Sequence, residues 1–233
     1  MSQRPVRIAG SHTRENTGLL AAAEKRTLVW IATRLPSGIH SDHLSSLGLV
    51  AMAAAGVSFA FYPLSSWAVV GVLVALAINW FGDSLDGTVA RVRNQQRPRY
   101  GFYVDHVIDL AGTTFLLGGL ACSGLMSPLP ATLALAGFLL VSAETYLATH
   151  AAGVFRMSFM GIGPTELRIL IAIGAIRAAV NPWVTFGESG AIRLFDLGAL
   201  IGAVGMFVVF AISAVRNTIA LSAADPRPER SHG

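Results

Sequence analysis

Residues 82–109 read GDSLDGTVARVRNQQRPRYGFYVDHVID and hold four aspartates, at positions 83, 86, 105 and 109. Apolar sequence lies on both sides of this stretch, and the whole chain is 53% hydrophobic but only 13% charged. Soluble domains have about a quarter of their residues charged. The composition, together with a mean hydropathy of +0.59, therefore indicates a membrane protein.

Outward from this stretch, the chain divides into apolar runs of the length that crosses a membrane. A helix needs about 20 residues to span about 30 Å of hydrocarbon, and the runs lack the period-two alternation of strands. We predict an all-α, polytopic membrane protein with six transmembrane helices. The six runs cover residues 44–62, 66–82, 107–126, 129–149, 167–185 and 194–215.

Polar segments flank the predicted membrane domain. Residues 19–35 place several aliphatic side chains on one helical face, with basic residues among them. This pattern predicts a short amphipathic helix that lies in the membrane interface. We expect a disordered N-terminus over residues 1–18, a membrane domain over residues 19–219 and a disordered tail over residues 220–233.

Basic residues are unevenly distributed between the two sides of the membrane. With a cytoplasmic N-terminus, 15 of the 17 lysines and arginines fall on or near the cytoplasmic side, and Arg177 and Arg193 near the other. Positive residues concentrate on cytoplasmic loops, so we predict an inner (plasma) membrane protein with both termini in the cytoplasm. The basic residues are spread over separate loops, which favours anionic lipid over nucleic acid as their partner.

The four aspartates form two pairs. Asp83 and Asp86 are three residues apart and Asp105 and Asp109 are four apart, so each pair lies on one helical face. If the two helix ends pack together, four carboxylates converge, and each charge deep in a membrane costs roughly 2.5–3.5 kcal/mol. Ion pairs to arginines offset part of this cost. One alternative is therefore that the aspartates only cap the helix ends and pair with arginines. Divalent cations offset it more fully, and carboxylate oxygens suit Mg²⁺ or Mn²⁺.

Glycines and an arginine surround these acids. A glycine lets a ligand approach the backbone closely, and an arginine can hold a phosphate group. Gly87, Gly101 and Arg91 supply these features. Together with carboxylates and a divalent metal, they suit a diphosphate ligand.

The chain resembles the CDP-alcohol phosphatidyltransferase family in one eight-residue signature. It reads Asp83-x-x-Asp86-Gly87-x-x-Ala90-Arg91, then nine residues, then Gly101-x-x-x-Asp105-x-x-x-Asp109. Such enzymes move a phospho-alcohol group from a CDP-linked donor to a hydroxyl and release CMP. The resemblance implies that the four aspartates hold two Mg²⁺ or Mn²⁺ ions and that Asp109 is also the general base. It assigns CDP binding to Asp83, Asp86, Gly87, Ala90, Arg91, Gly101 and Asp105.

The resemblance leaves more than one pair of substrates open. The default member uses CDP-diacylglycerol and a soluble alcohol, and the family resemblance also implies a homodimer. A shorter similarity between Glu144 and Glu166 is to the choline and ethanolamine phosphotransferases, which join a CDP-linked headgroup to diacylglycerol. A divalent-ion transporter is an alternative of another class, although transporters place coordinating groups near the bilayer midplane.

Further polar residues lie on the predicted cytoplasmic side and are candidates for acceptor binding. They are His150, Arg156, Glu166 and Arg168. Each has a simpler interpretation, because interfacial histidines usually bond a neighbour and the arginines fit the positive-inside pattern. Glu166 also follows Pro164-Thr165, a typical start of a helix. The family often has Pro-Asn and Thr near residues 41–45, where this chain has Ser41, Asp42 and Ser45.

Overall fold

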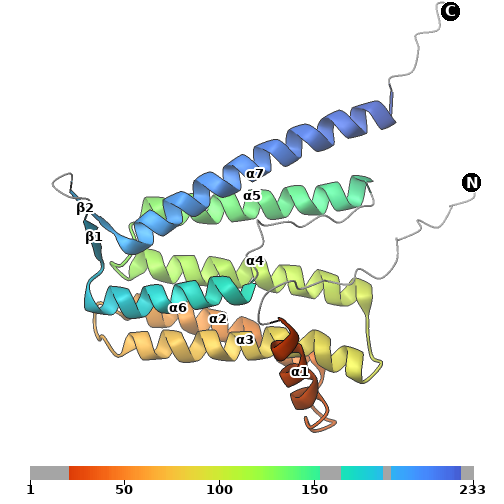
Figure 1. The fold of residues 1–233 in the computed structure, drawn as a ribbon, viewed down its shortest axis with the longest axis horizontal. Helices are drawn as coiled ribbons and strands as arrows, with labels where there is room; N and C mark the ends of the chain where they lie inside the picture. Colours follow the sequence, from red (N-terminus) through yellow and green to blue (C-terminus); the bar gives the residue numbers. More distant parts are fainter. Residues whose placement is uncertain (1–20, 153–163, 186–189, 227–233) are drawn as a thin grey trace, which may run out of the picture.

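The computed structural model describes residues 21–152, 164–185 and 190–226, and nearly all of this part is helical. Long helices lie alongside one another, while a short helix and a small β-hairpin lie at opposite ends of the bundle (Figure 1). The elements are α1 (Ala21–Ala32), α2 (Ser41–Ala60), α3 (Ala68–Val92), α4 (Pro98–Cys122), α5 (Pro128–Ala152), α6 (Pro164–Val180), β1 (Trp183–Thr185), β2 (Ala191–Arg193) and α7 (Leu194–Ala224). We call the end with α1 and the α3–α4 connection the α1 end, and the end with β1 and β2 the hairpin end.

Five of the described helices are long and apolar enough to cross a membrane: α2, α3, α4, α5 and α7. The prediction of an all-α, polytopic membrane fold is confirmed. Helix α6 has 17 residues, a length of about 26 Å at about 1.5 Å per residue. It runs between the α1 end and the hairpin end (Figure 1), so the predicted total of six spans depends on α6.

The fifth apolar run extends to residue 185, but the helix that it forms ends earlier. Helix α6 stops at Val180, and Trp183–Thr185 instead pairs antiparallel with Ala191–Arg193. Pro182 has no amide hydrogen to donate within a helix, and it disfavours the helical conformation in the preceding residue. The sequence pattern did not reveal this hairpin, because both strands are only three residues long.

Glycines bring α2 into close contact with both α3 and α4. A Cβ atom on Gly82 would lie 2.6 Å from the carbonyl oxygen of Leu44, and one on Gly119 would overlap the carbonyl oxygen of Gly56. Any larger side chain at these points would push the helices apart. Helix α2 therefore sets the positions of α3 and α4, the two helices that carry the aspartates.

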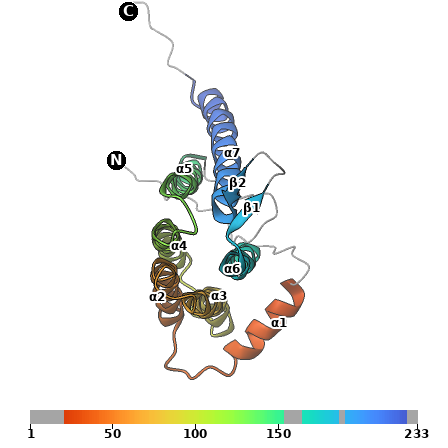
Figure 2. The same ribbon diagram turned by 90° about the vertical axis from the view of Figure 1, so that its left-hand side faces the viewer.

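Helix α1 crosses the α1 end at an angle to the bundle (Figure 2). Its Leu28 and Ala32 pack in a buried cluster with Leu85 and Val89 of α3, while Trp30 is 58% exposed. One face thus packs on protein and the other is open, as expected for the amphipathic helix predicted over residues 19–35.

Arg93, at the end of α3, holds the connection between α1 and α2. Its guanidinium donates to the carbonyl oxygens of Leu35, Pro36 and Ile39 at 2.9, 3.0 and 2.5 Å. These charge-assisted bonds are stronger than neutral ones. They anchor α1 beside the end of α3 that carries the first aspartate pair.

Candidate active site

The two aspartate pairs lie on helices joined by a short connection. Asp83 and Asp86 are in the last turns of α3, and Asp105 and Asp109 are in the first turns of α4. The chain reverses between them through Asn94, which has a positive φ of 55°, and Pro98 begins α4, a position that suits proline. All four acids therefore lie at the α1 end of the bundle.

Three of the four carboxylates converge. Asp83, Asp105 and Asp109 each offer an oxygen, and these oxygens all lie within 4.8 Å of one another. The oxygens that bind Mg²⁺ lie about 2.1 Å from it, so two on opposite sides of the ion are about 4.2 Å apart. Small side-chain rotations would close the observed spacing to that value, and the donor set therefore fits a hard divalent cation.

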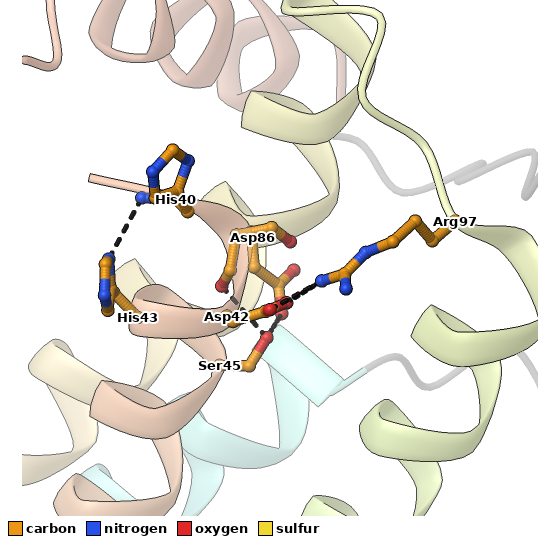
Figure 3. Close-up of polar contacts among 7 residues, drawn as sticks. His40, Asp42, His43, Ser45, Asp86 and Arg97 are labelled. Atoms are coloured by element: carbon orange, nitrogen blue, oxygen red, sulfur yellow. Dashed lines mark hydrogen bonds and ion pairs between the residues drawn. The ribbon is translucent and has the colours of Figure 1, made fainter. Parts of the chain in front are cut away.

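The fourth aspartate, Asp86, points to α2 instead. Its Oδ2 accepts a hydrogen bond of 2.6 Å from the Ser45 hydroxyl, and its Oδ1 accepts one from the backbone amide of Gly87 (Figure 3). We expected four carboxylates to converge, and in this structure three of them do. Ser45 lies in the segment where the chain departs from the family pattern, and its hydroxyl is the hydrogen-bond partner of Asp86.

Asp83 has a cationic partner from another helix. Arg168 of α6 donates from Nη2 to Asp83 Oδ2 at 2.6 Å and from Nε to Asn79 Oδ1 at 2.6 Å. Arg168, predicted as an acceptor contact, is therefore joined to the carboxylate cluster. Sequence reasoning missed Asn79, although a polar residue one turn before Asp83 in an apolar helix was an available signal.

The remaining signature residues line the same part of α3 and α4. The side chain of Arg91 turns back along α3, where its Nη2 donates to Thr88 Oγ1 at 3.0 Å. A Cβ on Gly87 would lie 3.2 Å from Arg91 Nη1, whereas one on Gly101 would meet no described atom within 4 Å. Ala90 is half-buried. The open space beside Gly101 and the Arg91 guanidinium are thus features that would let a phosphate group approach.

A family model described as CDP-alcohol phosphatidyltransferase matches residues 42–219, most of the chain and all four aspartates. The chain belongs to this family. It is also 30% identical over 171 residues to an archaetidylinositol phosphate synthase from Pyrococcus horikoshii, an alignment that covers 70% of this chain and 88% of the relative. The family resemblance predicted from the eight-residue signature is confirmed.

The other predicted acceptor residues of this CDP-alcohol phosphatidyltransferase family member are more exposed than Arg168 or lie outside the described residues. His150 is exposed in the last turn of α5, and Glu166 is exposed in the first turn of α6. Arg156 lies outside the described residues. Both exposed residues lie at the α1 end, the end that carries the carboxylate cluster.

Aromatic residues connect α4 to α5 beside the carboxylates. The buried His106 ring lies 4.1 Å from the Phe102 ring and 5.0 Å from the Tyr146 ring, measured between centroids. This packing joins α5 to the aspartate-bearing turns of α4.

An exposed ion pair bridges α2 and the α3–α4 connection. Arg97 Nη2 lies 2.5 Å from Asp42 Oδ1 (Figure 3). The Arg97 guanidinium also stacks on the Tyr100 ring, 3.9 Å from its centre. The hydrogen bond to Asp42 raises the pKa of Arg97 above its ordinary value. The ion pair closes one side of the α1 end, next to Ser45 and Asp86.

Proposed function

We propose that this chain transfers a phosphatidyl group from a CDP-linked lipid, CDP-diacylglycerol first among them, to a hydroxyl of a small soluble alcohol, releasing CMP. The convergence of three signature carboxylates in a family member is the observation that carries the proposal. The relative is named for a product with an inositol phosphate headgroup. That name favours a lipid-bearing donor and a soluble acceptor over a CDP-linked headgroup and diacylglycerol.

The residues have separate roles in this reaction. Asp109, the exposed member of the cluster, takes the proton of the acceptor hydroxyl. The hydroxyl oxygen then forms a bond to the phosphatidyl phosphorus, and the diphosphate P–O bond to CMP breaks, with the electron pair leaving on CMP. A bound divalent ion would neutralise the diphosphate and the departing CMP. The four aspartates would hold one or two such ions, with Asp83, Asp105 and Asp109 contributing the oxygens that already converge. The CDP group would lie beside Gly87, Ala90, Arg91 and Gly101.

The topology is part of the proposal. Six passes, with α6 as the fifth, put α1 and the end of α7 on one side, and the 15-to-2 distribution of basic residues supports placing that side in the cytoplasm. A homodimer is also proposed. Cβ atoms on Gly198 and Gly202 of α7 would meet no described atom within 4 Å, so this small-residue face has room for another helix.

The test is CMP release by the purified protein. We expect CMP by mass spectrometry with CDP-diacylglycerol and one acceptor from a panel of inositol phosphate, inositol, glycerol phosphate and serine. Added chelator should stop it, and Mg²⁺ or Mn²⁺ should restore it. CMP formed only with CDP-choline and diacylglycerol would overturn the choice of donor, and Mn²⁺ uptake into liposomes without CMP would overturn the enzymatic proposal.

A further inference from the structure

Asp83 is held by residues that do not belong to the eight-residue signature. The Arg168–Asp83 ion pair is only 2.6 Å long, and its side chains are 15% and 27% exposed. Such partly buried, charge-assisted bonds are stronger and more directional than surface ion pairs. The orientation of the Asp83 carboxylate therefore depends on where α6 places Arg168.

Asn79 fixes the other side of the Arg168 guanidinium. Asn79 is 4% exposed; its Nδ2 donates to the Gly48 carbonyl oxygen at 2.9 Å, and its Oδ1 accepts from Arg168 Nε. A buried amide with an unsatisfied group would be costly, so both of these bonds matter. A continuous polar connection thus runs from the α2 backbone through Asn79 and Arg168 to Asp83.

The planar guanidinium makes this connection rigid. Two of its N–H groups, on Nε and Nη2, are directed at two acceptors one turn apart on α3, a fork that lysine cannot reproduce. Asp83 Oδ2 accepts from Arg168, and a carboxylate has further lone pairs to offer a cation. This arrangement is expected of a residue that does not bind the metal itself but orients one of its ligands through a hydrogen bond.

We propose that Asn79 and Arg168 are positioning residues that aim the Asp83 carboxylate at the divalent cation, with Arg168 acting through Asp83 and not on the acceptor. This rests on the proposed function only in that the cation is the one the transfer reaction uses. The two residues act as a unit, so removing either loosens the same carboxylate.

The first test measures Mn²⁺ binding without any substrate. The free Mn²⁺ signal in electron paramagnetic resonance is titrated against detergent-purified protein for the variants Asn79→Leu, Arg168→Gln and Arg168→Lys. Loss of a partner behind a metal ligand typically weakens metal binding by about 10–100-fold, and we expect this for all three. Asn79→Leu changes no charge and Arg168→Lys keeps the charge, so a shared loss in both shows that geometry, not charge, is responsible.

Matched controls lie on the same and neighbouring helices. Arg177 is on α6 at its other end, where it donates to the Asn181 carbonyl oxygen, and Asn217 of α7 donates to Glu144 at 2.6 Å. Arg177→Gln and Asn217→Leu should leave Mn²⁺ binding unchanged. Melting temperatures identify any variant that fails to fold, and Arg168→Lys then stands in for Arg168→Gln.

Kinetics separate positioning from acceptor binding. We expect the Mn²⁺ concentration for half-maximal rate to rise in all three variants while the KM for the acceptor stays near the wild-type value. A raised acceptor KM in the Arg168 variants alone, with normal Mn²⁺ binding, would overturn the proposal. If the wild-type protein binds Mn²⁺ but releases no CMP from any donor, the proposed function is overturned. The positioning roles are then tested by the Mn²⁺ affinities of the variants alone.

Discussion

The two ends of the bundle each combine aspartate, serine and arginine, but in different proportions. At the hairpin end Asp196, which is 8% exposed, accepts from the Ser127 amide at 2.6 Å and from the Ser127 hydroxyl at 2.8 Å. Arg193 donates to the same Ser127 hydroxyl at 2.7 Å and lies 4.0 Å from Asp196. One acid thus meets one cation and two donors. At the α1 end, three carboxylates converge, and Arg168 pairs with one of them, Asp83.

This difference separates an acid with a structural role from the acids that we propose bind the cation and act in catalysis. Asp196 is in the first turn of α7, where a negative charge is favoured, and its hydrogen bonds join the start of α5 to the start of α7. Its charge is balanced within the protein. At the α1 end three carboxylates lie close together, and the repulsion between like charges costs free energy that a bound cation would offset. This convergence of like charges, more than the presence of aspartate, distinguishes the two ends.

The largest expected effect is that of Asp109→Asn. An amide of the same shape cannot take a proton, and general-base catalysis contributes about 10²–10⁴-fold. We expect CMP release to fall by that factor while the melting temperature stays within the range of the wild type. Asp196→Asn serves as the control and should keep its activity. Near-normal rates in Asp109→Asn would remove the assignment of the base.

A second, smaller effect is expected on stability at the contact between α2 and α4, two helices that run between the ends. Gly119→Ala places a methyl group on the Gly56 carbonyl oxygen, a backbone atom that cannot rotate away, and overpacking of this kind costs about 3 kcal/mol at its upper end. Thermal unfolding in detergent should show the loss. The neighbouring Gly118 has no described atom within 4 Å of its Cβ position, so Gly118→Ala should be tolerated. Equal stability of the two variants would contradict the close α2–α4 contact.

The smallest effect is on stability at the hairpin end. Asp196→Asn removes the charge and one acceptor from bonds to Ser127, and such bonds contribute about 1–2 kcal/mol each. We expect a lower melting temperature with unchanged Mn²⁺ binding and unchanged CMP release per folded molecule. A loss of Mn²⁺ binding in this variant would mean that the two ends are coupled, against the separation described above.

Much of this protein follows from its sequence, because the deciding signals are local. Runs of about 20 apolar residues specify membrane helices whatever their neighbours are, and the spacings of Asp83 with Asp86 and of Asp105 with Asp109 put each pair on one helical face. The family and the identity of the carboxylate-bearing segment were predictable for this reason. The polar connection through Asn79 was not, although its residue type was visible.

Tertiary structure alone decided which carboxylates meet and what holds them. Helical spacing places residues on a face but does not set how that face is rotated toward its neighbours, and here close glycine contacts of α2 with α3 and α4 do so. Asp86 consequently turns to Ser45, and Arg168, 85 residues away in sequence, reaches Asp83. Side-chain partners between helices depend on such packing, which no local pattern of residues specifies.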